Sequence, residues 1–164
     1  MVEADRLRFD FSHFQAVTPE EIRKIEDWVN RVVFEDPAVA KSEMSIDEAK
    51  SKGAIAFFGE KYGDRVRVVS VGSGISIELC GGTHLEHAGT IGGFSITAES
   101  SSGSGIRRIE AVTGAKAVEL GRASEALLGE LSQLLKAPRT DLVKKVQKVV
   151  EELGRLKSRA GSAA

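Results

Sequence analysis

Hydrophobic and polar residues alternate at the start of the chain, in the segment RLRFDFSHF. Every second position carries an apolar or ring-containing side chain: Leu7, Phe9, Phe11 and His13. Because successive side chains of a β-strand point to opposite faces, this repeat of two predicts a half-buried strand. We interpret His13 as a structural residue on the apolar face of that strand.

Two stretches with helical spacing follow. In residues 18–34 a threonine, then Pro19, then a glutamate three positions after the threonine precede apolar residues that recur every three or four positions. A capping hydroxyl, a proline at the first helical position and a carboxylate in the first turn predict the start of an amphipathic helix. Ser45 with Glu48 repeats the capping pattern and predicts a short helix that stops at Gly53.

The middle of the chain alternates between apolar segments and glycine-rich turns. Four segments predict strands: 66–71, 75–79, 93–99 and 106–112. The first two are joined by Gly-Ser-Gly at 72–74, which predicts a hairpin. The segment SSSGSG at 100–105 has the composition of a flexible loop, and AIAFFGEKYG at 54–63 predicts a buried turn.

From Ala115 onward the apolar period changes from two to that of a helix. A break at 137–139 separates two helices, the second of which is expected to begin at a Thr140 cap. Its apolar residues step by four and three, as in a heptad repeat: Leu142, Val146, Val149, Leu153 and Leu156. Two heptads are too short to stand alone, so this seam needs either the preceding helix or another chain as its partner.

These elements predict an α+β fold in which an antiparallel sheet is packed with helices, followed by an α-helical hairpin or coiled coil. We expect the mixed domain at 1–114, the helical segment at 115–159 and a flexible tail at 160–164. A chain of 164 residues with 41% hydrophobic and 29% charged residues is typical of soluble globular proteins. Since no apolar run approaches the roughly 20 residues of a membrane-spanning helix, we expect no membrane contact.

The N-terminus lacks the pattern of a signal peptide, and a single cysteine cannot form an internal disulfide, so we expect a cytoplasmic location. The net charge of −1 gives no long-range attraction for nucleic acid. The segment 136–159 differs, because it contains eight Lys or Arg and three acidic residues. It is typical of a solvated helix face or of a surface that contacts a phosphate backbone, with Lys144, Lys145 and Lys148 as candidates.

The residues best suited to chemistry lie in the stretch IELCGGTHLEH. It contains the only cysteine, Cys80, and two of the three histidines, His84 and His87, around a Gly-Gly pair. We expect these glycines to adopt backbone angles that a side chain would forbid, and so to turn the thiol and the imidazole toward one point. Zinc accepts both ligand types, and His87 is a candidate for a third ligand. A cysteine nucleophile with histidine as its base, and a plain turn beside a buried cysteine, are the alternatives.

The chain resembles the editing domain of alanyl-tRNA synthetase in five segments, in the family's order and spacing: RLRFDFSHF, TPEEIRKIEDWVN, GAIAFFGEKYGDRVRVVSVG, ELCGGTH and SGIRRIEAVTGAKA. The helices that follow resemble the connecting and dimerising coiled-coil segment of that family. The resemblance implies hydrolysis of the ester between tRNA(Ala) and a wrongly attached serine or glycine. It implies no ligase activity for these residues, because the family's domain that activates alanine is not among the matching segments.

In that family zinc is held by a His-x-x-x-His motif together with the cysteine and histidine of Cys-x-x-x-His. The second motif corresponds to Cys80 and His84, which the resemblance implies as metal ligands and, with Thr83, as catalytic residues. The first motif lies upstream of the RLRFDF strand, so we expect a chain truncated at its N-terminus, with half of the ligands and weaker zinc binding. The alternative is a catalytically inactive fragment that retains tRNA binding or dimerisation.

The resemblance implies the acceptor end of tRNA(Ala) as a partner and a homodimer through the C-terminal helices. Arg107 and Arg108 are candidates for contact with the tRNA, with a strand-edge salt bridge as the alternative. Thr83 is a candidate for a hydrogen bond to the serine hydroxyl, because a site built for a hydroxyl rejects alanine. The alternative for Thr83 is a turn hydroxyl that bonds its own backbone.

Overall fold

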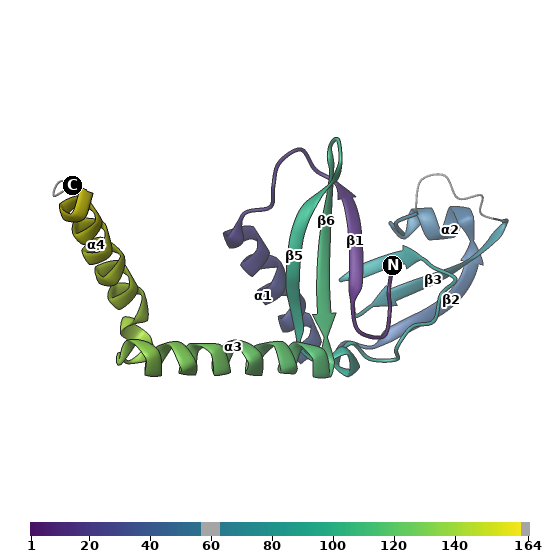
Figure 1. Cartoon of the computed structure of the whole chain (residues 1–164). Helices are drawn as coiled ribbons and strands as arrows, with labels where there is room; N and C mark the ends of the chain where they lie inside the picture. Colours follow the sequence, from purple (N-terminus) through teal and green to yellow (C-terminus); the bar gives the residue numbers. More distant parts are fainter. Residues whose placement is uncertain (57–62, 162–164) are drawn as a thin grey trace. The chain divides into compact units, whose positions relative to one another are not determined.

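The computed structural model describes residues 1–56 and 63–161, so most of the turn expected at 54–63 lies outside the described residues. The chain divides into two compact units, Met1–Ala117 and Val118–Ala164. Within the described residues, the first unit contains two three-stranded antiparallel sheets with helices beside them, and the second is helical. The predicted α+β class is confirmed (Figure 1).

The first sheet joins the beginning and the end of the first unit. β1 (Leu7–Ser12) pairs with β6 (Ile106–Thr113), which also pairs with β5 (Phe94–Gly103), and the pairs are antiparallel (Figure 1). The predicted N-terminal strand is therefore confirmed. Its hydrogen-bonding partner lies at the far end of the unit in sequence, and no local pattern reveals that pairing.

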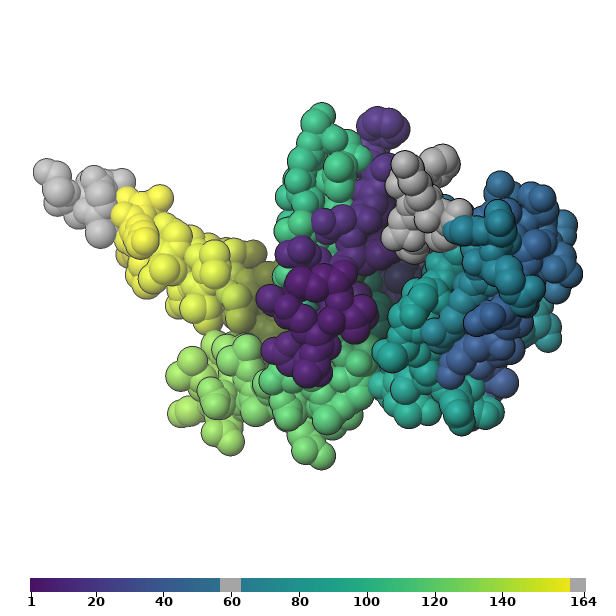
Figure 2. All heavy atoms as spheres, turned by 90° about the vertical axis from the view of Figure 1, so that its right-hand side faces the viewer, coloured from purple at the N-terminus to yellow at the C-terminus, as the bar shows by residue number. Residues whose placement is uncertain are grey.

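The apolar side of β1 is more exposed than the alternation of its residues predicts. Phe9 is 55% exposed and stacks on Phe11 with the ring centroids 5.9 Å apart, and His13 is exposed beyond the end of the strand. The residues before β1 turn back along it. The Met1 amino group donates to the Arg8 carbonyl at 2.9 Å, and the Arg8 N–H donates to the Met1 carbonyl at 2.8 Å. This N-terminal turn lies on the surface of the first unit (Figure 2).

The second sheet contains β2 (Val39–Ser45), β3 (Arg65–Val71) and β4 (Ser76–Leu79), in the order β2-β3-β4. β3 and β4 form the predicted hairpin, and the two glycines of its turn have φ of 56° and 97°. β2 was not predicted, because most of its residues are exposed and Met44 is its only buried one. This strand has no apolar face of its own, and it forms because its backbone pairs with that of β3.

The short helix α2 (Ile46–Ser51) lies against the second sheet. Its predicted cap is present, since the Glu48 N–H donates to Ser45 Oγ at 3.2 Å. The core of this part of the chain comprises Met44, Ala49, Val66, Val68 and Leu79. Because Leu79 immediately precedes Cys80, this core holds the first residue of the candidate chemical stretch in place.

The helix α1 (Pro19–Glu35) begins with the predicted capping box. The Glu21 N–H donates to Thr18 Oγ1 at 3.3 Å, and the Glu21 carboxylate accepts from the Thr18 N–H at 2.8 Å. The Asn30 side chain exchanges two hydrogen bonds with the Phe94 backbone, of 2.9 and 2.8 Å, so α1 is tied to the start of β5. α1 also contacts the short 3₁₀ helix η1 (Ala88–Ile91).

The expectation of a flexible loop at 100–105 is wrong. β5 continues to Gly103 and its serines pair with β6, which leaves Ser104-Gly105 as the turn. Two register shifts in this pairing mark bulges, and Gly105 has a φ of 68°. Serine and glycine are typical of loops, but the bonds of a sheet come from the backbone, so a polar segment can continue a hairpin once its neighbours pair.

The second unit contains the 3₁₀ helix η2 (Arg139–Asp141), the helix α4 (Leu142–Gly161) and most of α3 (Gly114–Leu135). Thr140 lies inside η2, so its predicted role as the cap of α4 is wrong. Arg139 forms an ion pair with Glu125 of α3, which ties the connection to that helix.

The apolar seam of α4 is mostly exposed. Leu142 is buried, but the other four seam residues are 43–56% exposed: Val146, Val149, Leu153 and Leu156. Among the helices that the structure describes, none is both long enough and apolar enough to cross a membrane.

Candidate functional site

The candidate site is the segment between β4 and η1, which we call the site loop (Cys80–His87). At its start, the Cys80 N–H donates to the Arg67 carbonyl at 3.2 Å, and Arg67 Nη1 donates to the Gly81 carbonyl at 3.3 Å. Toward its end, the Val39 N–H donates to the Glu86 carbonyl at 2.8 Å. The second sheet therefore holds both ends of the loop, and the residues between them carry the chemistry.

Cys80 and His84 come together around Gly82. A Cβ atom on Gly82 would lie 3.6 Å from Cys80 Sγ and 3.9 Å from His84 Cε1, so both side chains border the space that this glycine leaves open. Neither Gly81 nor Gly82 has a φ in the left-handed region, so the expected backbone role of the pair is wrong. The missing side chain of Gly82 therefore leaves a position that both reactive groups border, and the glycine does not form an unusual turn.

The orientation of His84 suits a metal ligand. His84 Nδ1 lies 3.0 Å from the Gly82 carbonyl oxygen. A carbonyl only accepts, so Nδ1 carries the proton in this bond and the neutral ring keeps its lone pair on Nε2. Histidines that bind metals generally donate their second ring N–H in this way. Cys80 and His84 are both half-buried, and thiolate and imidazole are ligands that zinc accepts together.

The structure does not bring His87 to this pair. Its Nδ1 lies 3.4 Å from the carbonyl oxygen of Asp36 and 3.5 Å from Asp36 Oδ2, at the end of α1. Within residues 1–56 and 63–161 no three His, Cys, Asp or Glu side chains form a group that could hold a metal ion. Cys80 and His84 thus fit two of the ligand positions that zinc uses, and further ligands would come from water or from outside the described residues.

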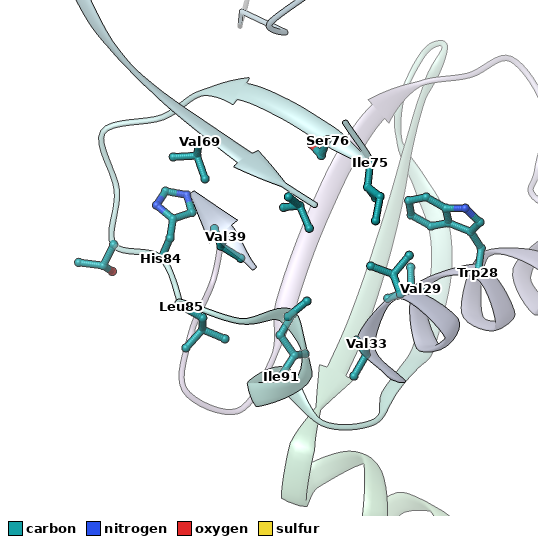
Figure 3. Close-up of a pocket in the computed structure, with 14 residues that line it drawn as sticks. Trp28, Val29, Val33, Val39, Val69, Ile75, Ser76, His84, Leu85 and Ile91 are labelled. Carbon is teal, nitrogen blue, oxygen red and sulfur yellow. The ribbon is translucent and has the colours of Figure 1, made fainter. Parts of the chain in front are cut away.

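An apolar pocket of about 400 Å³ opens beside the site loop. Its lining includes Thr83 and His84. Figure 3 shows His84 on one side of the pocket, and Trp28 and Val33 from α1 on another. Thr83 is exposed, so its hydroxyl can be reached from solvent. The sequence pattern did not indicate Trp28 as a wall residue. Its only signal was a large aromatic side chain beside the apolar face of an amphipathic helix, where it is 48% exposed.

The two candidate arginines on β6 form ion pairs with neighbouring strands. Arg107 meets Glu99 of β5 with two bonds of 2.6 Å, and Arg108 meets Asp10 of β1 with two bonds of 2.7 Å. Each arginine lowers the pKa of its carboxylate below the usual range through these hydrogen bonds. The geometry is that of the strand-edge salt bridge considered as the alternative, and contact with tRNA through Arg107 and Arg108 stays a prediction.

The candidate lysines of the second unit surround a shallow hollow of about 340 Å³. Lys144, Lys145 and Lys148 lie in the first two turns of α4, and Lys136 and Asp141 complete the lining with Ala137 and Pro138. Cations near the N-terminus of a helix oppose its dipole, so this arrangement does not stabilise α4. Four ammonium groups beside one carboxylate instead favour an anionic partner.

The sequence of this chain is similar to that of a known protein family and of several curated proteins. Residues 66–110 match the family described as the threonyl and alanyl tRNA synthetase second additional domain. The alanine–tRNA ligase of Pseudomonas fluorescens is 48% identical over 171 residues, which cover 100% of this chain and 20% of that relative. That of Acetivibrio thermocellus is 52% identical over 153 residues, 93% of this chain and 17% of the relative. That of Lysinibacillus sphaericus is 57% identical over 146 residues, 89% of this chain and 16% of the relative. The chain therefore spans a fifth or less of the length of these curated relatives.

Proposed function

Because the chain belongs to the alanine–tRNA ligase family, we propose that its site loop is a hydrolytic site that releases wrongly attached serine or glycine from tRNA(Ala) in the cytoplasm. The observation that carries this proposal is the meeting of Cys80 and His84 around the open space beside Gly82. Both side chains are half-buried, so an ester can reach them from solvent. The loop that carries them is held by backbone hydrogen bonds at both ends.

Cys80, Gly82 and His84 have distinct tasks in this reaction. Water attacks the ester carbonyl carbon, the bond from that carbon to the ribose oxygen breaks, and the ribose oxygen takes up the proton. Cys80 Sγ and His84 Nε2 are the atoms that would hold zinc, which when bound supplies polarisation of the carbonyl or of the water. Without a metal, the same Nε2 lone pair accepts a proton from the attacking water. The Gly82 carbonyl holds the imidazole in the required tautomer.

Thr83 is proposed to select the amino acid. Its exposed hydroxyl lies next to His84 in sequence and can bond the hydroxyl of a serine ester. An alanyl ester lacks that hydroxyl and leaves the site's polar group without its partner, which disfavours hydrolysis of the correct product. Thr83→Val removes the hydroxyl with little change in volume, so we expect slower release of serine and unchanged release of glycine.

The direct test measures release of serine from Ser-tRNA(Ala) by the purified chain with added zinc. We expect Cys80→Ala and His84→Ala to lower the rate by about 100-fold or more, the contribution of a positioned acid–base or metal group. His13→Ala is the matched control, because His13 is exposed and lies outside the loop. A wild-type rate no higher than that of the protein-free reaction would refute the proposal.

A contact between RNA and the lysine hollow is the second candidate function. The concentration of Lys136, Lys144, Lys145 and Lys148 around one hollow favours it, because a phosphate backbone binds through clustered cations. Charge reversal with Lys144→Glu and Lys148→Glu should weaken tRNA binding and reduce its salt dependence. Binding of wild-type chain that does not weaken as salt is added would argue against this contact.

Pairing of two chains through α4 is favoured by its exposed seam. Val146, Val149, Leu153 and Leu156 lie on one face of the helix and stay about half exposed, as expected for a surface that a second helix covers. Sedimentation at increasing protein concentration tests this pairing. A monomer at the highest concentration refutes it, and Leu153→Asp should convert any dimer to monomer.

A further inference from the structure

Asp36 ends helix α1 and contacts the segment that follows the site loop. Its backbone is left-handed, with φ 49° and ψ 48°, and its N–H donates to the Val33 carbonyl at 3.2 Å. The Asp36 carboxylate then accepts the Gly89 N–H at 2.6 Å through Oδ1. His87 Nδ1 lies within 3.5 Å of both the carbonyl oxygen and Oδ2 of Asp36. The C-cap residue of α1 thus contacts two positions soon after His84, namely 87 and 89.

Gly89 provides the close approach that this contact requires. A Cβ atom at position 89 would lie 2.5 Å from Asp36 Oδ1 and 2.8 Å from Asp36 Cγ. Heavy atoms cannot approach so closely, so any larger residue would push the carboxylate away. The φ of Gly89 is outside the left-handed region, and the glycine is therefore needed here for space rather than for its backbone angles.

Backbone hydrogen bonds extend this contact toward the catalytic residues. The Ala88 N–H donates to the Pro37 carbonyl at 3.0 Å, and the Val39 N–H donates to the Glu86 carbonyl at 2.8 Å. Residues 36–39 therefore hold residues 86–89 along their length. The Asp36 carboxylate adds its side-chain bond to the Gly89 N–H, and this bond is charge-assisted, which makes it a strong one.

We propose that Asp36 is a positioning residue for the site loop, an inference that rests on the proposed hydrolytic function. Five residues, 81–85, lie between the bond of Cys80 to β3 and the bond of Glu86 to β2. If the second anchor loosens, His84 drifts relative to Cys80 although neither residue has changed. Catalysis depends on geometry held to a fraction of an ångström, so the loss appears in kcat more than in KM.

Three substitutions at position 36 separate this role from helix capping. Asp36→Gly keeps a residue that favours the left-handed conformation but removes the carboxylate. Asp36→Asn keeps both the left-handed preference and an oxygen that can accept the Gly89 N–H. Asp36→Ala loses both properties. If Asp36 only caps the helix, the glycine variant should behave as wild type. If Asp36 positions the loop, only the asparagine variant should behave as wild type.

The experiment measures two quantities on the full chain: ¹⁵N order parameters of the amides at 81–85, and kcat and KM for release of serine from Ser-tRNA(Ala). In Asp36→Gly we expect the order parameters to fall from about 0.85 toward 0.6 and kcat to fall about tenfold, with KM unchanged. Asp36→Asn should restore both quantities. Thermal unfolding of each variant reports whether the helix cap is intact.

Gly89→Ala tests the contact between Asp36 and Gly89 from the glycine side. It should also lower the order parameters of the amides at 81–85. Unchanged order parameters at 81–85 in Asp36→Gly, or an Asp36→Asn variant as impaired as Asp36→Ala, would overturn the inference. If the wild-type chain releases no serine, the hydrolytic proposal fails by itself. The order parameters then still decide whether Asp36 positions the loop.

Discussion

Gly82 offers a sharp test of the candidate site, because Gly81 beside it serves as a matched control. A methyl group on Gly82 would lie 3.6 Å from Cys80 Sγ and 3.9 Å from His84 Cε1, both ordinary van der Waals distances. A methyl group on Gly81 would meet no atom within 4 Å. Neither residue has a left-handed φ, so alanine strains the backbone at neither position.

The two substitutions should therefore have similar effects on stability and different effects on chemistry. Gly82→Ala and Gly81→Ala should each change the free energy of unfolding by less than about 1 kcal/mol, in the stabilising direction, by reducing the entropy of the unfolded chain. The methyl group at position 82 would contact both Cys80 and His84, whereas one at position 81 would contact neither. A zinc ion needs sulfur at about 2.3 Å and nitrogen at about 2.0 Å, so a methyl group packed against both side chains would restrict their approach to a shared ion.

We expect Gly82→Ala to weaken zinc binding and serine release by about 10- to 100-fold, the usual effect of disturbing the surroundings of a metal ligand. Gly81→Ala should stay within about twofold of wild type. Zinc affinity is measured by competition with a chelating dye, and serine release with Ser-tRNA(Ala). Equal behaviour of the two variants in both assays would refute the assignment of the space beside Gly82 as the reacting site.

Other predictions concern stability. The pKa of Glu99 is lowered in the folded chain by Arg107, so this pair stabilises the fold above the ordinary glutamate pKa of about 4.3 and loses that effect as pH falls through the lowered value. Glu99→Gln should flatten the fall in urea midpoint between pH 5 and 2, and parallel curves would contradict this. Leu79→Ala should cost about 2–5 kcal/mol in urea unfolding, because Leu79 is 3% exposed in the core next to the site loop. Thr18→Ala should cost about 1 kcal/mol through loss of the α1 cap, and Thr18→Ser should restore it.

Local signals in the sequence predicted much of the fold. The capping pairs Thr18 with Glu21 and Ser45 with Glu48 begin helices as expected, because a cap depends on residues within one turn of each other. The Gly-Ser-Gly hairpin between β3 and β4 was predicted for the same reason. Three local predictions were wrong: Thr140 lies inside η2, the serines at 100–102 belong to β5, and neither Gly81 nor Gly82 has a left-handed φ.

The sequence did not indicate the features of the sheets that depend on a distant partner. β2 has a polar, mostly exposed sequence and becomes a strand because β3 offers its backbone groups. β1 was predicted as a strand, but its pairing with β6 joins opposite ends of the first unit. Such pairings leave no periodic trace in either segment, since backbone hydrogen bonds do not depend on side-chain type.

The sequence by itself indicated the candidate residues of the site, because Cys80 with His84 four residues later, in the context ELCGGTH, is visible without coordinates. Tertiary structure decided how that site is built. In the folded chain His84 Nδ1 lies beside the Gly82 carbonyl, His87 contacts Asp36, and the thiol and imidazole both border the position of a Cβ atom on Gly82. The sequence lists which side chains the site contains. The orientation of those side chains depends on groups such as Arg67 and Asp36, which contact this region only after the chain has folded.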